Sequence, residues 1–360
     1  ALSPEEAVAA AARHEKDGAF RKAIAVYETF LKKHPDHVRG RDVRYRIGIC
    51  HDNIGAIEAA IASFRQVIAA GPSRSFKHRA DTHMRLSRLL GEAEKYGEGI
   101  GVLRGLLTEG AGVSEDEAQM LCAGYYALAG QPDEAAVMFN VLKNRIRSPL
   151  AQEAAYKVAI VWMKAGQTDL AKKAVEEYAE RYAASPRTVD LYLRLARHLF
   201  EQKQYKSAIA VSTQVQTEFS ERPEAAEAAF IIALCYRETD NLDRAIEALK
   251  ALGVTAERVR NGLLACEAWF EIARIQQDKQ QKMEEAMTHY RRAAEASRRP
   301  ITERQQLILE HSLYQVAEYE YRAERWSAAL DLFLQLRSVG SKMNLLGRIL
   351  NCRSRLDEKG

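Results

Sequence analysis

The sequence lacks long apolar runs, a strong excess of either charge and any clustering of cysteine. No uncharged stretch approaches the roughly 20 residues that a helix needs to cross a bilayer, so a transmembrane helix is excluded. Lys and Arg number 53 against 49 Asp and Glu, and a net charge of +4 is too small to indicate nucleic-acid binding. With 28% charged and 47% hydrophobic residues, the composition is neither disordered nor fibrous.

Cysteine is scarce and irregularly placed. Cys50, Cys122, Cys235, Cys266 and Cys352 lie far apart, and none of them forms a CxxC or other metal-binding spacing. We interpret them as small buried hydrophobic residues. A fold held together by disulfides is therefore not expected.

Proline is also scarce, but its spacing is regular. Six of the eight prolines are separated by 37 or 77 residues, which indicates one unit of about 37 residues that is repeated along the chain. These prolines are Pro35, Pro72, Pro149, Pro186, Pro223 and Pro300.

Small residues recur with the same period at two positions of each unit. The first set is Ala11, Gly48, Ser87, Ala123, Ala159, Ala196, Ala233, Ala273 and Ala317. The second set, twelve residues later, is Ala23, Ala60, Gly99, Ala135, Ala171, Ala208, Ala245, Ala286 and Ala329. Small residues at both positions allow two helices to approach closely. In the eighth unit the spacing is thirteen, which places one inserted residue in the turn between Gln276 and Lys282.

Turn signals separate the two small residues of most units, for example Asp17-Gly18 and Ala165-Gly166-Gln167. Each unit therefore consists of a helix, a short turn, a second helix and a loop marked by Pro or Gly. No segment shows sustained apolar alternation with a period of two, so no sheet is expected. The sequence predicts an all-α fold.

The complete pattern resembles the tetratricopeptide repeat. Repeat one fits best, with Ala11, Ala23, the aromatic Tyr27 four residues later, and Pro35 near the end. The resemblance implies a right-handed superhelix, an α-solenoid, of about nine helix-turn-helix repeats in residues 1–340. The repeats span approximately 4–37, 41–74, 80–113, 116–149, 152–186, 189–223, 226–256, 266–300 and 310–340. Units of 36–39 residues resemble the bacterial envelope subgroup, which includes outer-membrane assembly lipoproteins and Tol-Pal coordinator proteins.

Residues 341–360 are predicted to form a C-terminal capping helix and a tail. Leu346, Ile349, Leu350 and Leu356 are expected to face inward, with Lys342, Arg348, Arg353 and Arg355 in water. Because Leu346, Gly347 and Leu350 also resemble the start of a first helix, a tenth repeat cut short is the alternative. The start at Ala1 suggests a processed form or a piece of a longer protein.

No catalytic motif is present. HExxH, GxSxG and GxxxxGK[ST] are absent from the sequence. Gly97–Gly101 (GEGIG) resembles part of a nucleotide loop, but it falls inside a predicted helix with no strand before it. His34–His37 (HPDH) offers two metal ligands without a third, and we interpret it as an exposed loop. We expect neither an enzyme nor a cofactor.

The resemblance implies a partner-binding surface on the concave groove. With the first small residue of each unit as position eight, family positions two, five, nine, twelve and thirteen face this groove. Position five is apolar or aromatic at Val8, Tyr45, Met84, Met120, Tyr156, Leu193, Phe230, Phe270 and Tyr314. Position two is acidic at Glu5, Asp42, Asp81, Glu117, Glu153, Asp190, Glu227 and Glu267, and departs only at His311.

Both rows have a structural explanation as well. Carboxylates near a helix N-terminus are stabilised by about 0.3–1 kcal/mol through the helix dipole, and apolar residues can pack between units. Aromatic residues on a concave surface nevertheless suit peptide recognition. We predict a non-catalytic protein–protein interaction scaffold whose groove holds an extended peptide or a partner's helix.

Basic residues cluster in Arg39–Arg46 and Arg74–Arg88, with net charges of +3 and +4. A solvated face is the simplest interpretation. The alternative is an envelope module that binds an anionic partner or polysaccharide through this face, with Arg41, Arg44, Arg79 and Arg85 as candidates. A cytoplasmic adaptor or regulator is a further alternative. The subgroup resemblance favours the periplasm or cell envelope, with membrane association only through a partner.

The third unit is expected to be the weakest part of the array. Residues 91–112 contain seven of the 20 glycines, and each helix-interior Gly costs about 0.5–1 kcal/mol relative to Ala. Amide hydrogen exchange should be faster across residues 91–112 than in units five to seven. Equal or slower exchange there would contradict this expectation.

Overall fold

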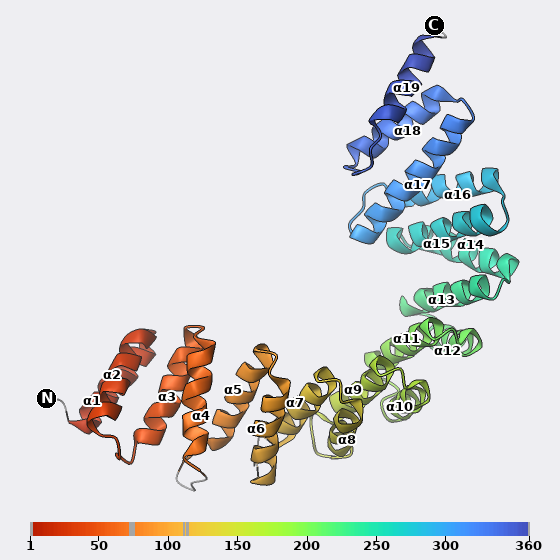
Figure 1. The fold of residues 1–360 in the computed structure, drawn as a ribbon. Coiled ribbons are helices and arrows are strands. Elements are labelled where there is room, and N and C mark those ends of the chain that lie inside the picture. Colours follow the sequence, from red (N-terminus) through yellow and green to blue (C-terminus); the bar gives the residue numbers. More distant parts are fainter. Residues whose placement is uncertain (1–2, 72–75, 111, 113–114, 359–360) are drawn as a thin grey trace. The chain divides into compact units, whose positions relative to one another are not determined.

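The computed structural model describes residues 3–71, 76–110, 112 and 115–358. Nineteen α-helices follow one another in these residues as consecutive packed pairs, and no strand occurs among them (Figure 1). The all-α prediction is confirmed. None of the helices in the described ranges combines the length and apolar character needed to cross a membrane. Pro72 of the proline series and Arg74 of the basic run lie outside the described residues.

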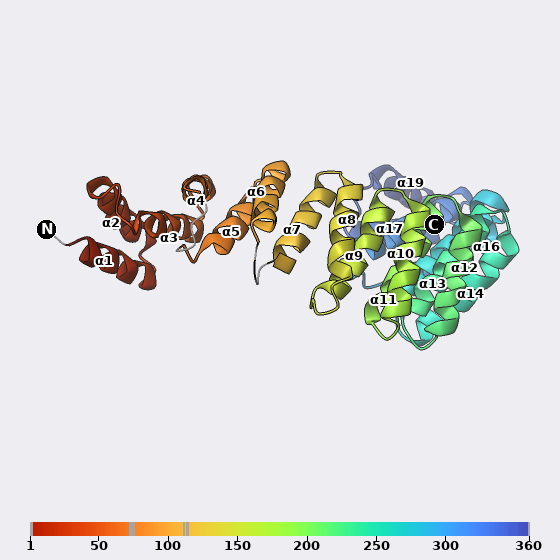
Figure 2. The same cartoon turned by 90° about the horizontal axis from the view of Figure 1, so that it is seen from below.

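Packing divides the chain into two compact units, residues 1–182 and 183–360. In the first unit, each helix lies against the next along the chain (Figure 2). Its helices are α1 (Pro4–Lys16), α2 (Phe20–Lys33), α3 (Gly40–Asn53), α4 (Ile57–Ala69), α5 (Arg79–Glu92), α6 (Tyr96–Thr108), α7 (Glu115–Leu128), α8 (Pro132–Lys143), α9 (Ala151–Lys164) and α10 (Thr168–Arg181).

The second unit continues the pattern and ends with a helix that has no described partner after it. Its helices are α11 (Pro186–Glu201), α12 (Tyr205–Glu218), α13 (Glu224–Glu238), α14 (Leu242–Arg258), α15 (Gly262–Arg274), α16 (Met283–Ala296), α17 (Glu303–Arg322), α18 (Trp326–Ser338) and α19 (Leu346–Asp357). A π-helical turn, η2 (Ile275–Lys279), extends α15.

The paired small residues lie where the two helices of a pair pack together. Ala11 and Ala23 are both fully buried between α1 and α2. A Cβ atom added to Gly48 of α3 would lie 2.6 Å from the ring of Phe64 in α4, closer than side chains can approach. The small residue on one helix therefore makes room for the large residue on the other.

Neighbouring pairs are also joined by ion pairs in a repeating register. Arg46 of α3 pairs with Glu15 of α1 at 2.6 Å, and Arg85 of α5 pairs with Asp52 of α3 at 3.3 Å. Both pairs join position six of one unit to position twelve of the unit before it. Each is partly exposed and contributes little alone, but together they favour one stacking register.

A tyrosine from the fourth unit fills the space left by glycines in the third. A Cβ atom on Gly91 would collide with the Tyr125 side chain, and one on Gly99 would lie 3.0 Å from the same ring. The Tyr125 hydroxyl donates a hydrogen bond to the carbonyl of Ser87 at 2.7 Å. These two glycines are required by packing. Gly101 and Gly105 have no neighbouring atom within 4 Å of an added Cβ.

A tryptophan fills the corresponding space in the second compact unit, residues 183–360. Trp269 is 1% exposed, and its indole lies so close to Gly253 of α14 that an added Cβ there would be 2.7 Å away. The indole N–H donates to Glu257 at 2.7 Å, and the Arg292 guanidinium lies 3.7 Å from the ring centre. Trp269 thereby ties α14, α15 and α16 together.

The C-terminal helix α19 is rotated relative to the sequence expectation. Ile349 is buried, but Leu346 and Leu350 are 59% and 55% exposed, so their inward placement was wrong. Arg348, expected in water, is half-buried and pairs with Glu318 at 2.9 Å. The rotation follows from Leu345, which is buried just before α19 and sets the phase of the helix.

Replacing the unpacked glycines of α6 should stabilise the protein. We expect Gly101→Ala and Gly105→Ala each to raise the free energy of unfolding by about 0.5–1 kcal/mol, because Ala favours the helix and meets no atom. Gly91→Ala should lower it, because the methyl group collides with Tyr125. Urea denaturation followed by circular dichroism measures all three, and a stabilising Gly91→Ala would contradict the packing described.

Candidate functional site

The position-five side chains fall into two groups. Those that are at most 9% exposed are Val8, Tyr45, Met84, Leu193 and Phe270. Those that are half-buried are Met120, Tyr156, Phe230 and Tyr314. The first group fills space between helices, so within this row only the second group keeps appreciable surface for a partner.

Tyr45 of the apolar row and Asp81 of the acidic row contact each other. The Tyr45 hydroxyl donates to the Asp81 carboxylate in the next helix pair, and its ring stacks on His78 at 4.4 Å. Burial alone would raise the pKa of Asp81, but hydrogen bonds from Tyr45 and Arg85 outweigh it and hold that pKa below its ordinary value. This contact joins two neighbouring repeats.

The same register recurs between the eighth and ninth units. Phe270, at position five, meets His311, at position two of the next unit, edge to face with the ring centres 5.3 Å apart. Burial lowers the pKa of His311, which therefore stays neutral near pH 7. Here, too, positions five and two serve stacking.

Most of the acidic row is engaged in ion pairs. The pairs are Glu117 with Arg88 at 3.8 Å, Glu153 with Lys157 at 3.5 Å, Asp190 with Arg194 at 2.8 Å, Glu227 with Arg197, and Glu267 with Arg304 at 3.2 Å. Asp42, by contrast, is exposed. These carboxylates are compensated by nearby basic side chains, which leaves little free negative charge along the row.

Three of the four candidate arginines contact other side chains of the first compact unit, residues 1–182. Arg44 is half-buried beside Gly40. The contacts of the others are Arg79 with the Glu109 carboxylate, Arg85 with Asp81 at 2.7 Å and Asp52 at 3.3 Å, and Arg41 over the Phe76 ring at 4.4 Å. The basic face therefore presents less free charge than the sequence suggests.

The inserted residue of the eighth unit takes the form of the π-helical turn η2. The N–H of Gln280 donates to the carbonyl of Ile275, five residues earlier, at 3.2 Å. Gln276 is 2% exposed, and its amide bonds both Glu285 and His289 at 2.8 Å. Because single π turns in helices often mark functional sites, the surface around η2 is of particular interest.

A hollow of about 470 Å³ lies beside η2, between α16 and α17. Four of its residues occupy family groove positions: Tyr314 at position five, Glu318 at nine, Gln277 at twelve and Arg322 at thirteen. The remaining lining residues are Met283, Met287, Gln315, Tyr319 and Ala323. This is where groove positions from two neighbouring units converge on one cavity.

The polar groups of this hollow are held in place by one another. The Gln277 amide accepts from the Tyr290 hydroxyl at 2.7 Å and donates to Gln315 at 3.2 Å. Glu318 is neutralised by Arg348 at 2.9 Å, whereas Arg322 is exposed. The hollow therefore combines apolar walls, fixed amides and a positive charge.

A second hollow, of about 430 Å³, lies against Ile275, Asp278 and Lys279 of η2 and is mostly charged. It is lined by Arg237, Glu238, Asp240, Arg274, Ile275, Asp278 and Lys279. Arg237 pairs with Glu238 at 2.6 Å and with Glu271, and Arg274 pairs with Asp278 at 3.9 Å. Since its charges are largely compensated and Ile275 is its only apolar residue, it offers less for a partner to bury.

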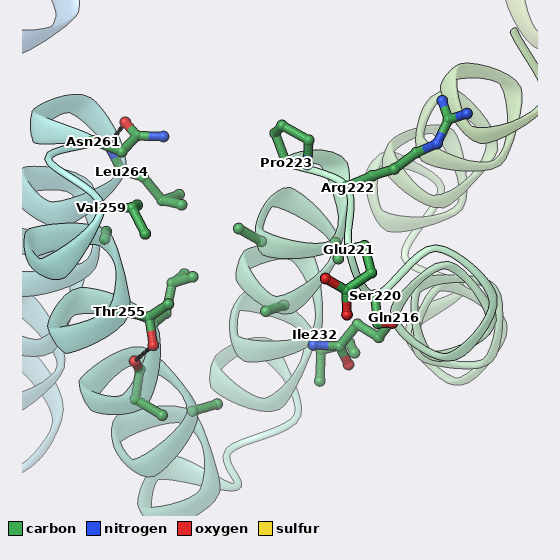
Figure 3. Close-up of a pocket in the computed structure, with 17 residues that line it drawn as sticks. Gln216, Ser220, Glu221, Arg222, Pro223, Ile232, Thr255, Val259, Asn261 and Leu264 are labelled. Atoms are coloured by element: carbon green, nitrogen blue, oxygen red, sulfur yellow. Dashed lines mark hydrogen bonds between the residues drawn. The ribbon is translucent and has the colours of Figure 1, made fainter. Parts of the chain in front are cut away.

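An apolar groove of about 670 Å³ occurs elsewhere in the second compact unit, residues 183–360 (Figure 3). Residues of α13, of α14 and of the segment after α12 line it; Figure 3 shows Val259 and Leu264 opposite the Glu221–Pro223 segment. It is lined by Gln216, Ser220, Glu221, Arg222, Pro223, Ala225, Ala226, Ala229, Ile232, Ala248, Ala251, Leu252, Thr255, Ala256, Val259, Asn261 and Leu264. No groove position of the family lines it.

The apolar groove was not predicted from the sequence, although two features of the sequence indicate it. Proline is absent between Pro223 and Pro300, and the spacing from Ala245 to Ala286 is 41 residues. Both reflect α14, which runs for 17 residues and projects beyond the usual end of a second helix. The extra turn supplies Thr255, Ala256 and, just beyond it, Val259.

The cysteines and the two weak motifs lie in packed or helical parts of the structure. All five cysteines are buried and free, and burial raises the pKa of Cys50 to about 12 and that of Cys266 to about 11. Gly97–Gly101 lies within α6. His34 and His37 both pack against Phe30, with ring centres 5.5 Å and 5.2 Å away.

Comparison with protein families decides what the helix pairs are. Family models described as tetratricopeptide repeat match residues 7–75, 156–212, 213–253 and 267–300, which is more than half of the chain. The chain belongs to the tetratricopeptide repeat (TPR) family. TPR proteins are generally non-catalytic, and the TPR repeats of this chain suggest a protein–protein interaction scaffold.

Solved TPR structures resemble this chain at low identity. A TPR protein from Parabacteroides merdae ATCC 43184 is 17% identical over 69% of this chain and 91% of its own, with a TM-score of 0.43. The C-terminal part of a TPR repeat-containing protein from Cytophaga hutchinsonii is 14% identical over 74% and 98%, with a TM-score of 0.49. PilW, a type IV pilus biogenesis factor, is 18% identical over 62% and 96%, with a TM-score of 0.38. A search of curated proteins finds no match.

The Tyr45–Asp81 contact should make stability depend on pH. Because the folded-state pKa of Asp81 is lowered, its contribution is present above the unfolded pKa of about 3.9 and is lost as the pH falls through the folded value. The destabilisation caused by Asp81→Asn should therefore shrink as the pH is lowered from 7 to 3. Urea denaturation at several pH values measures it.

Asp42→Asn is the matched control, because Asp42 occupies the same repeat position one unit earlier and is exposed. Its effect should be small at every pH. An Asp81→Asn effect that does not vary with pH would contradict the contact.

Proposed function

We propose that this TPR protein is a non-catalytic scaffold that binds an extended peptide segment in the hollow beside η2. The observation that supports the proposal most is the convergence of four groove positions on that hollow: Gln277, Tyr314, Glu318 and Arg322. Elsewhere, the position-five residues Tyr45 and Phe270 and most of the acidic row are used in helix packing. We therefore place the partner site in the part of the predicted groove that lies in the eighth and ninth repeats.

The chemistry of the hollow indicates what kind of segment fits. Met283 and Tyr314 offer apolar surface for one side chain of the partner. The amides of Gln277 and Gln315 can bond the backbone of an extended chain. Arg322 is exposed at the hollow, so a carboxylate next to the apolar residue is favoured.

The other candidate surfaces are less well supported. Arg79 and Arg85 are already paired, which weakens the case for an anionic partner or polysaccharide on the Arg39–Arg88 face. The apolar groove of α12–α15 lacks the fixed polar groups that give a peptide its register. Both surfaces serve as alternatives in the test.

The proposed setting is the bacterial cell envelope, as part of a larger assembly. Units of 36–39 residues support this placement. A cytoplasmic adaptor with the same surface is the competing proposal. Fractionation of cells from the native source, with detection of this chain in each fraction, distinguishes the two.

A random phage-displayed peptide library selected on the purified protein tests the site. We expect the selected peptides to carry an apolar residue beside Asp or Glu. Tyr314→Ala should weaken their binding at least about tenfold, or about 1.4 kcal/mol, and Arg322→Ala should weaken it and reduce its salt dependence. Fluorescence anisotropy with a labelled selected peptide measures both effects.

Met120→Ala is the matched control. Met120 is a half-buried position-five residue in the other compact unit, residues 1–182, and does not line the hollow. It should leave binding unchanged. If binding survives Tyr314→Ala but is abolished by Ala229→Trp, which fills the apolar groove, the partner site lies in that groove. If binding is lost only on charge reversal of Arg44, the anionic-partner alternative holds.

A further inference from the structure

The apolar groove of α12–α15 is lined mainly by small aliphatic side chains, and none of its lining residues is aromatic. Six alanines from α13 and α14 line it: Ala225, Ala226, Ala229, Ala248, Ala251 and Ala256. Small residues on a helix surface let the backbone of another helix approach closely. The groove therefore has the side-chain composition of a helix-packing surface.

One wall of the groove is extended, because α14 is longer than the other second helices. It spans 17 residues, whereas the second helices of the other pairs span 12–14. Val259 follows its last residue, lines the groove and is 66% exposed. This valine leaves most of its surface outside the core of its own chain, so that surface is available to a partner.

The opposite wall, formed by the segment after α12, carries negative charge. In Figure 3 the Glu221 carboxylate points into the groove, whereas the Arg222 side chain points away from it. Glu221 is exposed, and its carboxylate has no hydrogen bond or ion pair within the described residues. Residues 218–224 hold three carboxylates, including Glu218 and Glu224, against one guanidinium. This wall attracts a cationic side chain.

The wall at the end of α14 carries the opposite charge. Arg258 and Arg260 flank Val259, both are exposed, and neither has an ion partner in the described part of the chain. The neighbouring Glu257 does not compensate them, since it pairs with Arg292 at 2.8 Å. A segment lying between the two walls therefore meets a negative side and a positive side.

The polar groups of the groove are used within the chain. The Thr255 hydroxyl donates to the carbonyl of Ala251 at 2.9 Å, and the Asn261 side chain accepts from the N–H of Leu264 at 3.1 Å. An extended peptide buried here would leave backbone groups unpaired, which is costly. A helix satisfies its own backbone between its ends, so an aliphatic groove suits a helix better.

We propose that this groove binds an amphipathic helix of a partner protein. The buried face of that helix carries an aliphatic stripe with anchors at the i, i+3, i+4 and i+7 spacing. Its cationic flank faces Glu221, and its acidic flank faces Arg258 and Arg260. The site is distinct from the hollow beside η2, with which it shares no lining residue.

Three synthetic helical peptides with the same leucine stripe test the proposal on the full chain by fluorescence anisotropy. The first has lysine on one flank and glutamate on the other, the second has lysine on both, and the third has glutamate on both. The first should bind at least about threefold more tightly than either of the others. Added salt should reduce this difference, because exposed charges are screened.

Variants of the protein locate the site. Ala251→Trp puts a large side chain into the groove from an exposed position and should weaken binding of the mixed-flank peptide at least about tenfold. Ala328→Trp, at an exposed alanine of α18, is the matched control and should leave binding unchanged. Glu221→Lys should weaken binding of the mixed-flank peptide about fivefold or more and strengthen binding of the glutamate-flanked peptide. Tyr314→Ala, in the hollow beside η2, should leave binding of all three peptides unchanged.

The three substituted residues Glu221, Ala251 and Ala328 are exposed, so circular dichroism and urea denaturation should match the wild type in each variant. The proposal is overturned if the mixed-flank peptide does not bind at concentrations up to about 1 mM. Equal binding of the three peptides, or binding that survives Ala251→Trp, overturns it as well. Loss of binding in Tyr314→Ala alone would place the helix in the hollow beside η2 instead.

Discussion

The structure depends on close contact between a small residue on one helix and a large ring on its neighbour. Gly48 beneath Phe64, Gly91 beneath Tyr125 and Gly253 beneath Trp269 leave no room even for a methyl group. These contacts fix how helices approach each other, because interiors are packed too densely to absorb an added side chain. Gly48 belongs to the regularly spaced small residues of the sequence, whereas Gly91 and Gly253 make contacts of the same kind outside that series.

Once the helices are fixed in this way, polar side chains of the first helices meet those of the next unit. Arg46 with Glu15 and Tyr45 with Asp81 are such contacts. Side chains used in this way are no longer available to a partner. Beside the π turn η2, by contrast, groove positions line a hollow with fixed amides.

The fold could be predicted from the sequence because it rests on periodic, local signals: small residues twelve apart, turn residues between them and prolines at intervals of 37 or 77. The insertion in the eighth unit was visible for the same reason. Which position-five residues are buried could not be predicted, since Tyr45 and Tyr314 are alike in sequence and differ only in their neighbours. Which side chains of α19 face inward was predicted wrongly for a similar reason, because the buried Leu345, just before the helix, determines it.

Hydrogen exchange of the protein with and without a peptide selected on it tests the central claim most directly. The account predicts slower exchange in residues 275–279 and in α17 when the peptide is bound, with little change in α3 and α5. Protection confined to α3 and α5, or to the α12–α15 groove, would contradict it.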